Sequence, residues 1–232
     1  MIIALMAIAP VIALLLYFYH KDKYEREPLR FLALSFFYGF MITFVAMVVE
    51  VALLSFVAAI NEFVVRIFLQ AFVVAALVEE GLKFMVFRAL VYRSNEFNEP
   101  YDGIVYAVMI SLGFATLENI LYLLSSYGRF GLFGVLNVGV FRALISVPLH
   151  AFCGVIMGYY LGLAKFTDSK EHERRYIYAG LGLAIFAHGF FNFFAFSGLI
   201  FGVCAMLLVF VLCWIFSVKA IKIHMVNSPF KK

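Results

Sequence analysis

Residues 72–87 read FVVAALVEEGLKFMVF, an apolar run with two carboxylates and one ammonium at its centre. The run is part of an apolar stretch of membrane-spanning length, where each charged side chain costs about 2.5–3.5 kcal/mol to insert. On a helix with about 100° per residue, Lys83 lies about 40° from Glu79 and falls between Glu79 and Glu80. The ammonium can therefore neutralise one carboxylate and leave the other as a general base, or the three groups form an ion pair that only fixes helix register.

The composition places the whole chain in a membrane. Of its 232 residues, 66% are hydrophobic and 19% aromatic, and the mean hydropathy is +1.02. We therefore expect an all-α, polytopic transmembrane bundle with a single domain over residues 1–232. The formal charge of +4 is too small to indicate a nucleic-acid partner and fits loops that meet anionic lipid. The three cysteines lie in apolar runs without CxxC spacing, which argues against disulfides and thiol chemistry.

Apolar runs of about 20 residues predict seven spans. Their approximate bounds are 1–19, 31–58, 64–87, 101–124, 134–164, 176–196 and 199–218. Most of the 18 Lys and Arg residues lie in alternate loops and in the tail, so we expect the N-terminus outside and the C-terminus in the cytoplasm. The first run has no basic residue before it and a basic loop after it, which predicts a retained anchor.

Several polar side chains lie deep in these predicted spans. Glu80, Glu118, His150 and His188 fall about 18–26 Å from the predicted cytoplasmic ends of four different helices. Four costly groups at one level predict a shared functional site. Asn119 follows Glu118 and is expected to support it.

His188 and Asn192 are spaced i, i+4 and so share one helix face. Both can donate hydrogen bonds to a developing oxyanion, as amide hydrolysis requires, or they can form a polar contact between helices. Outside this level, we expect the loop Asp22–Pro28 to be a solvated turn and Asp102 to cap a helix. Glu50 is expected to pair with Arg142 or to reach the interface.

The ordered set of these motifs resembles the PrsW-type intramembrane proteases, which are distantly similar to the CAAX prenyl proteases. The residues that carry the resemblance are Asp22–Pro28, Glu79–Lys83, Tyr101–Tyr106, Gly113–Tyr122, His150–Ala151 and the pair His188 and Asn192. The resemblance implies a protease of the bacterial cell membrane that cuts a single-span membrane protein. It also implies the first (site-1) cleavage of an anti-sigma factor, near the extracytoplasmic side.

The resemblance also implies roles for individual residues. Glu79 and Glu80 would be the acidic pair, one of them activating water, with Lys83 supporting them, and His188 and Asn192 would stabilise the oxyanion. Glu118 stands where the prenyl proteases have a histidine, and His150 is the candidate for the missing imidazole.

The sequence leaves the metal open. HExxH is absent, but Glu79, Glu80, His150 and His188 together offer ligands for zinc. We expect a metal-free mechanism without a cofactor, because the fixed charge of Lys83 repels a second cation.

Two other functions remain open on the sequence. Intramembrane Glu and His residues also serve as proton relays, so a proton- or ion-coupled transporter is the main alternative. No repeat symmetry or matched pair of broken helices supports it. The second is a scaffold protein held together by polar clamps. Cleavage of a reconstituted substrate separates the protease from both, and flux in sealed vesicles separates the other two.

Overall fold

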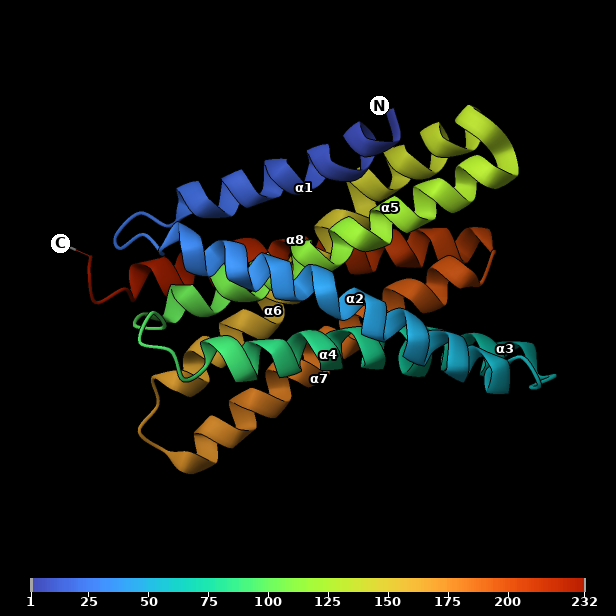
Figure 1. Ribbon diagram of the computed structural model, residues 1–232. Coiled ribbons are helices and arrows are strands. Elements are labelled where there is room, and N and C mark those ends of the chain that lie inside the picture. Colours follow the sequence, from blue (N-terminus) through green and yellow to red (C-terminus); the bar gives the residue numbers. More distant parts are fainter. Residues whose placement is uncertain (1, 232) are drawn as a thin grey trace.

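The computed structural model describes residues 2–231, so Met1 and Lys232 of the predicted domain lie outside the described residues. The described chain forms helices without any strand (Figure 1). The helices, with η for π-helix, are α1 Ile2–Lys21, α2 Leu29–Val57, α3 Phe63–Phe68, η1 Leu69–Leu77, α4 Val78–Val86, η2 Phe87–Val91, α5 Pro100–Phe141, η3 Arg142–Ser146, α6 Val147–Lys165, α7 Lys170–Phe196 and α8 Ile200–Val226. The prediction of an all-helical membrane bundle is confirmed.

Within residues 2–231, five helical stretches are long and apolar enough to cross a membrane. They are Ile2–Lys21, Leu29–Val57, Pro100–Lys165, Lys170–Phe196 and Ile200–Val226. The predicted spans 101–124 and 134–164 both fall inside the third of these, and the predicted span 64–87 falls on the succession of short α and π segments from α3 to η2. The number of crossings and the side of each terminus stay predictions.

The 42-residue helix α5 reverses direction near Gly131, which has φ 59° and ψ −149° inside the helix. This left-handed backbone conformation is open to glycine and strained for residues with a Cβ. The second arm of α5 then continues through η3 into α6, as the yellow-green bend in Figure 1 shows. One turn therefore joins the two predicted segments, and it lets α6 run back beside the first arm.

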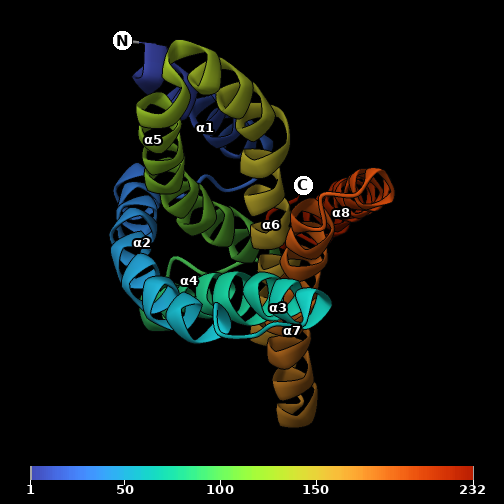
Figure 2. The same cartoon turned by 90° about the vertical axis from the view of Figure 1, so that its right-hand side faces the viewer.

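Helix α5 packs against α1, α2 and α6, and α6 packs against α7 and α8. The end-on view shows this arrangement, with α8 at the periphery (Figure 2). The contact between α5 and α6 is made by glycines: a Cβ on Gly158 would lie 2.2 Å from the carbonyl oxygen of Gly103. Small residues permit such backbone approach in membranes.

The loop between α1 and α2 is not the solvated turn that the sequence predicts. Asp22 and Glu27 are only 1% and 2% exposed. Asp22 Oδ2 accepts a hydrogen bond from the Glu27 amide, and Glu27 accepts one from the Tyr106 hydroxyl on α5. These contacts fold the loop onto α5. The capping role of Asp102 is confirmed, because it forms a capping box with Glu99 at the start of α5.

Candidate active site

Glu79, Glu80 and Lys83 lie on α4 and are all buried. The Lys83 ammonium is 2.8 Å from Glu80 Oε1 and 3.3 Å from Glu79 Oε2. It also lies 4.2 Å from the centre of the Phe114 ring, a favourable cation–π distance. The helical spacing thus places the ammonium between the two carboxylates, as predicted.

Two histidines from α6 and α7 join this group. Nδ1 of His188 is 2.9 Å from Glu80 Oε1, and Nδ1 of His150 is 3.1 Å from the Lys83 ammonium. Ionised carboxylates only accept and ammonium groups only donate, so Nδ1 of His188 carries a proton and Nδ1 of His150 presents its lone pair. In the neutral form of His188, Nε2 then carries the lone pair, 3.9 Å from Glu79 Oε1.

A chain of ionic contacts from α5 and η3 holds His150 in place. Nε2 of His150 donates to Glu118 Oε2 at 2.9 Å, and the same oxygen accepts from Arg142 Nη2 at 2.9 Å. Arg142 Nε donates to Asn119 Oδ1 at 2.5 Å, and Asn119 Nδ2 donates to the carbonyl of Ala7 at 3.2 Å. Carboxylates that bond the far nitrogen of a histidine fix its tautomer and ring orientation. Glu118 therefore directs the His150 lone pair toward the α4 cluster.

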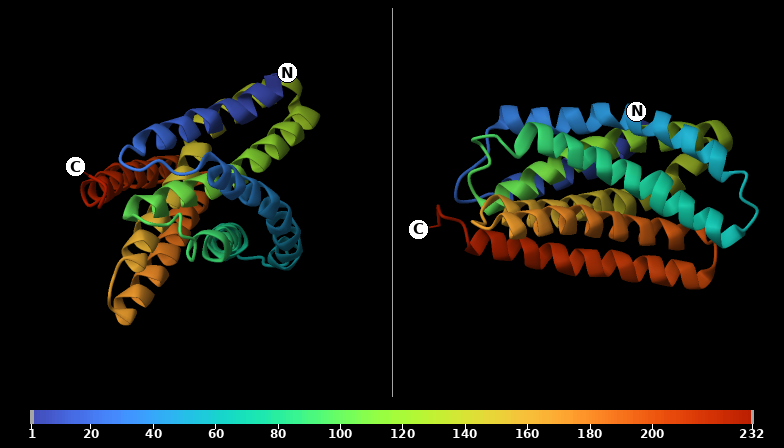
Figure 3. Two further views of the ribbon diagram at one scale, coloured as in Figure 1. Left: turned by 60° about the vertical axis from the view of Figure 1, so that its left-hand side comes forward. Right: turned by 90° about the horizontal axis from the view of Figure 1, so that it is seen from below.

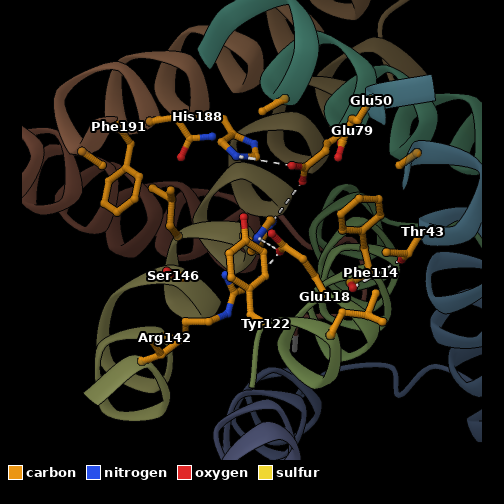
Figure 4. Close-up of a pocket in the computed structure, with 18 of the residues that line it drawn as sticks. Thr43, Glu50, Glu79, Phe114, Glu118, Tyr122, Arg142, Ser146, His188 and Phe191 are labelled. Atoms are coloured by element: carbon orange, nitrogen blue, oxygen red, sulfur yellow. Dashed lines mark hydrogen bonds and ion pairs between the residues drawn. The ribbon is translucent and has the colours of Figure 1, made fainter. Parts of the chain in front are cut away.

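Beside the cluster lies a cavity of about 680 Å³ between α2, η1, α4, α5, α6 and α7. Its polar lining includes Glu79, Glu118, His150, His188 and Asn192. Much of the remaining lining is apolar or aromatic. Figure 4 shows Glu79, Glu118 and His188 converging on this space. Glu79 lines the cavity whereas Glu80 does not, so the two carboxylates differ in access.

The structure thus brings together Glu79, Glu80, Glu118, His150 and His188, with Lys83 among them. Asn192 lies on the cavity wall, one turn from His188, without a hydrogen bond to any described side chain. Asn119 is joined to this group through Arg142, which donates a hydrogen bond to Asn119 and pairs with Glu118. The roles of these residues stay predictions.

Of the two alternatives predicted for Glu50, the pairing with Arg142 is wrong, because Arg142 pairs with Glu118. Glu50 instead lines the cavity with Thr43 and Tyr122, which the sequence did not single out. The sequence did indicate that Arg142 has a carboxylate partner, because an arginine inside a membrane span needs one. The choice between Glu50 and Glu118 required knowing which helix faces η3.

The donor set fits a divalent metal. One ligand atom from each of Glu79, Glu80, His150 and His188 lies within 4.8 Å of the others. Glu80 Oε2 is buried and has no hydrogen-bond partner within residues 2–231, so it is free to bind a metal while Oε1 holds Lys83 and His188. Imidazole nitrogens and carboxylate oxygens are ligands that zinc accepts. The lone pair of His150 Nδ1 accepts from the Lys83 ammonium, so this nitrogen binds a metal once the ammonium moves aside.

The comparisons with known proteins agree with one another. The model of the PrsW family of intramembrane metalloproteases matches residues 27–218. Proteins named Protease PrsW from Geobacillus kaustophilus (strain HTA426) and Bacillus subtilis (strain 168) are 45% and 41% identical, each over 80% of this chain and over 76% and 79% of the relative. One from Clostridioides difficile (strain 630) is 35% identical over 82% of this chain and 77% of the relative. No solved structure matches the chain significantly.

The expectation of a metal-free mechanism is wrong. The matching family is described as one of metalloproteases, and the four donors fit a metal. The positive charge of Lys83 does not act alone, because carboxylates surround it. Glu79, Glu80 and Glu118 outnumber Lys83 and Arg142, so the ionised cluster keeps a negative charge that attracts a cation.

The four metal donors, the cavity beside them and the family match over most of the chain lead to one conclusion: this multi-pass membrane protein belongs to the PrsW family of intramembrane metalloproteases.

Proposed function

We propose that the protein is a metal-dependent endopeptidase that hydrolyses a peptide bond of a membrane-bound regulatory protein. The substrate is a single-span anti-sigma factor, cut first near the extracytoplasmic side. The family membership and the motif resemblance support this proposal.

The observation that carries the proposal is the position of the donor set on the wall of the cavity. Glu79, His150 and His188 belong both to the donor set and to the lining. A volume of about 680 Å³ with aromatic walls suits a short apolar segment of a substrate chain. A scissile bond in this space would therefore meet the polar groups directly.

Glu80, His150 and His188 would hold the metal. This choice leaves Glu79 free and gives three protein ligands, the number typical of catalytic zinc sites. When bound, the metal polarises the scissile carbonyl and makes the attacking water more acidic. Zinc is the proposed ion because its ligands here would be imidazole nitrogens and a carboxylate oxygen.

Glu79 is the proposed general base, because it is the glutamate of the pair that lines the cavity. Its carboxylate takes the proton of the attacking water and then donates it to the leaving amine. Asn192 lies on the same wall, and its side-chain amide can donate to the oxygen of the carbonyl under attack. Lys83 keeps Glu80 ionised, and Glu118 keeps the proton of His150 on Nε2.

The test is cleavage in detergent of a purified single-span anti-sigma factor by the purified, zinc-loaded protein. We expect cleavage by the native protein and none by Glu79→Gln, with zinc content retained in that variant. Glu171→Gln changes an exposed carboxylate on α7 and serves as the control with full activity.

Two outcomes would contradict different parts of the proposal. Cleavage of a generic single-span substrate but not of an anti-sigma factor would refute the substrate only. Full cleavage by Glu79→Gln would refute its role as the base.

A further inference from the structure

Glu50 is a carboxylate on the cavity wall that no positive group of the described chain neutralises. The other carboxylates of the wall are paired, Glu79 with Lys83 and Glu118 with Arg142. No Lys, Arg or His nitrogen of residues 2–231 lies within 4.0 Å of the Glu50 oxygens. Its Oε1 is buried and has no hydrogen-bond partner in this part of the chain. The hydrolysis proposed above does not use Glu50.

Glu50 lies inside an apolar helix, close to one end of the bundle. It belongs to α2, which is long and apolar enough to cross a membrane, and it stands about 10 Å before Val57 at the end of this helix. That end of α2 and the loop to α3 lie at the far end of the molecule from the C-terminus of the chain (Figures 1 and 3). With the predicted cytoplasmic C-terminus, Glu50 lies toward the extracytoplasmic side.

The Glu50 side chain turns toward the cavity. It belongs to the cavity lining, and Figure 4 shows it in the same part of the cavity as Glu79. The outward face of α2 at this level is formed by other residues, since Val48 and Val51 are 72% and 68% exposed. The carboxylate is therefore presented to a molecule that occupies the cavity.

The chemistry of this wall defines the group that Glu50 would bind. An ionisable side chain inside a membrane span is costly and needs a partner, and a carboxylate pairs with hydrogen-bond donors and positive charge. Much of the remaining lining is apolar or aromatic, and in such a pocket a few polar groups decide which ligands bind. A Lys or Arg side chain fits both features, because its methylene groups lie along apolar surface while its charged end reaches the carboxylate.

We propose that Glu50 selects the substrate by pairing with a Lys or Arg side chain at the extracytoplasmic end of the apolar segment that enters the cavity. An acidic side chain at the same substrate position is rejected, because it would meet Glu50 with like charge. This inference rests on the proposed proteolysis and adds a recognition element to its substrate. Glu50 acts in binding and takes no part in the hydrolysis itself.

The test is binding of single-span peptides in detergent. The peptides carry Lys, Met or Glu at each residue in turn across the extracytoplasmic end of the span. The zinc-loaded Glu79→Gln protein is used, because it should bind the peptides without cutting them. We expect one position at which the Lys peptide binds about tenfold more tightly than the Met peptide, and the Glu peptide binds more weakly than both.

Three further variants assign this preference to Glu50. Adding Glu50→Gln should remove most of the difference between the Lys and Met peptides, whereas Glu50→Asp keeps the charge and should retain part of it. Glu50→Gln should fold normally, because no ion pair of the described chain is lost. The matched control is Glu62→Gln, which changes an exposed carboxylate between α2 and α3 and should keep the full preference.

Cleavage of the same peptides by the native protein separates this inference from the proposed function. The kcat/KM values should follow the order Lys, Met, Glu at the selected position. The inference is overturned if the three peptides bind equally at every position, or if the preference for Lys survives in Glu50→Gln. Binding that prefers Lys without cleavage of any peptide would refute the proteolysis and leave recognition by Glu50 in place.

Discussion

Replacing Glu118 by Gln should weaken metal binding through His150. Glu118 Oε2 accepts from both His150 Nε2 and Arg142 Nη2 at 2.9 Å. Glutamine keeps one acceptor oxygen but loses the charge, so it cannot hold both donors as firmly, and its amide can turn toward the histidine as a competing donor. Loss of such a partner behind a ligating histidine typically lowers metal affinity 10–100-fold, or by about 1.4–2.8 kcal/mol.

The assay is competition for Zn²⁺ with a chelator of known affinity, followed by cleavage measured at saturating Zn²⁺. A matched variant is Arg142→Gln, which breaks the same buried ion pair but leaves the contact between Glu118 and His150 in place. Both variants should lose stability, since breaking a buried pair costs about 3–5 kcal/mol. Only Glu118→Gln should lose most of its metal affinity. Equal metal affinity in Glu118→Gln and the native protein would refute the orienting role of this carboxylate.

Three further outcomes are expected. Glu79→Gln should abolish cleavage while normal amounts of protein accumulate in the membrane; loss of the protein itself, seen by immunoblot, would indicate a structural role instead. Gly158→Leu should lower the thermal unfolding midpoint, because its Cβ would meet the Gly103 carbonyl at 2.2 Å and overpacking costs about 1–3 kcal/mol, whereas Gly182→Leu, with nothing within 4 Å, should not. A reporter inserted near Arg129 should be external and one fused to the C-terminus cytoplasmic; the opposite signals would overturn the predicted topology.

Much of the fold could be predicted because membrane helices follow from hydropathy alone. The apolar runs located the helices, and the depth of Glu80, Glu118, His150 and His188 predicted that they would meet. The spacing of Glu79 and Lys83 predicted their contact, because helical geometry alone sets it.

The partners of Arg142 and the buried loop could not be predicted in the same way. From the sequence, Arg142 could pair with either Glu50 or Glu118. The rotation of the neighbouring helices decides which carboxylate faces it. Asp22 and Glu27 belong to a highly charged loop, and such loops are ordinarily exposed to water. Here the loop packs onto α5, where Tyr106, distant in sequence, donates a hydrogen bond to Glu27. Both cases depend on tertiary contacts that a single sequence does not encode locally. The prediction of a metal-free mechanism was wrong for a different reason. Whether the site attracts a cation depends on the summed charge of ionised side chains from several helices, and not on Lys83 alone.

The π-helical segments have a consequence for variation in length. Segment η1 ends two residues before Glu79, and η3 ends four residues before His150. A π turn holds one residue more than an α turn, so deleting a residue within η1 restores α-helical bonding at little local cost. Because the tightened turn still covers about one full rotation, Glu79, Glu80 and Lys83 keep their direction toward the histidines after this deletion. A second deletion, now within a regular α-helix, would turn them by about 100° away from the histidines. In these two segments, loss of the one extra residue would therefore be tolerated, and larger changes in length would be selected against even where any apolar side chain is tolerated.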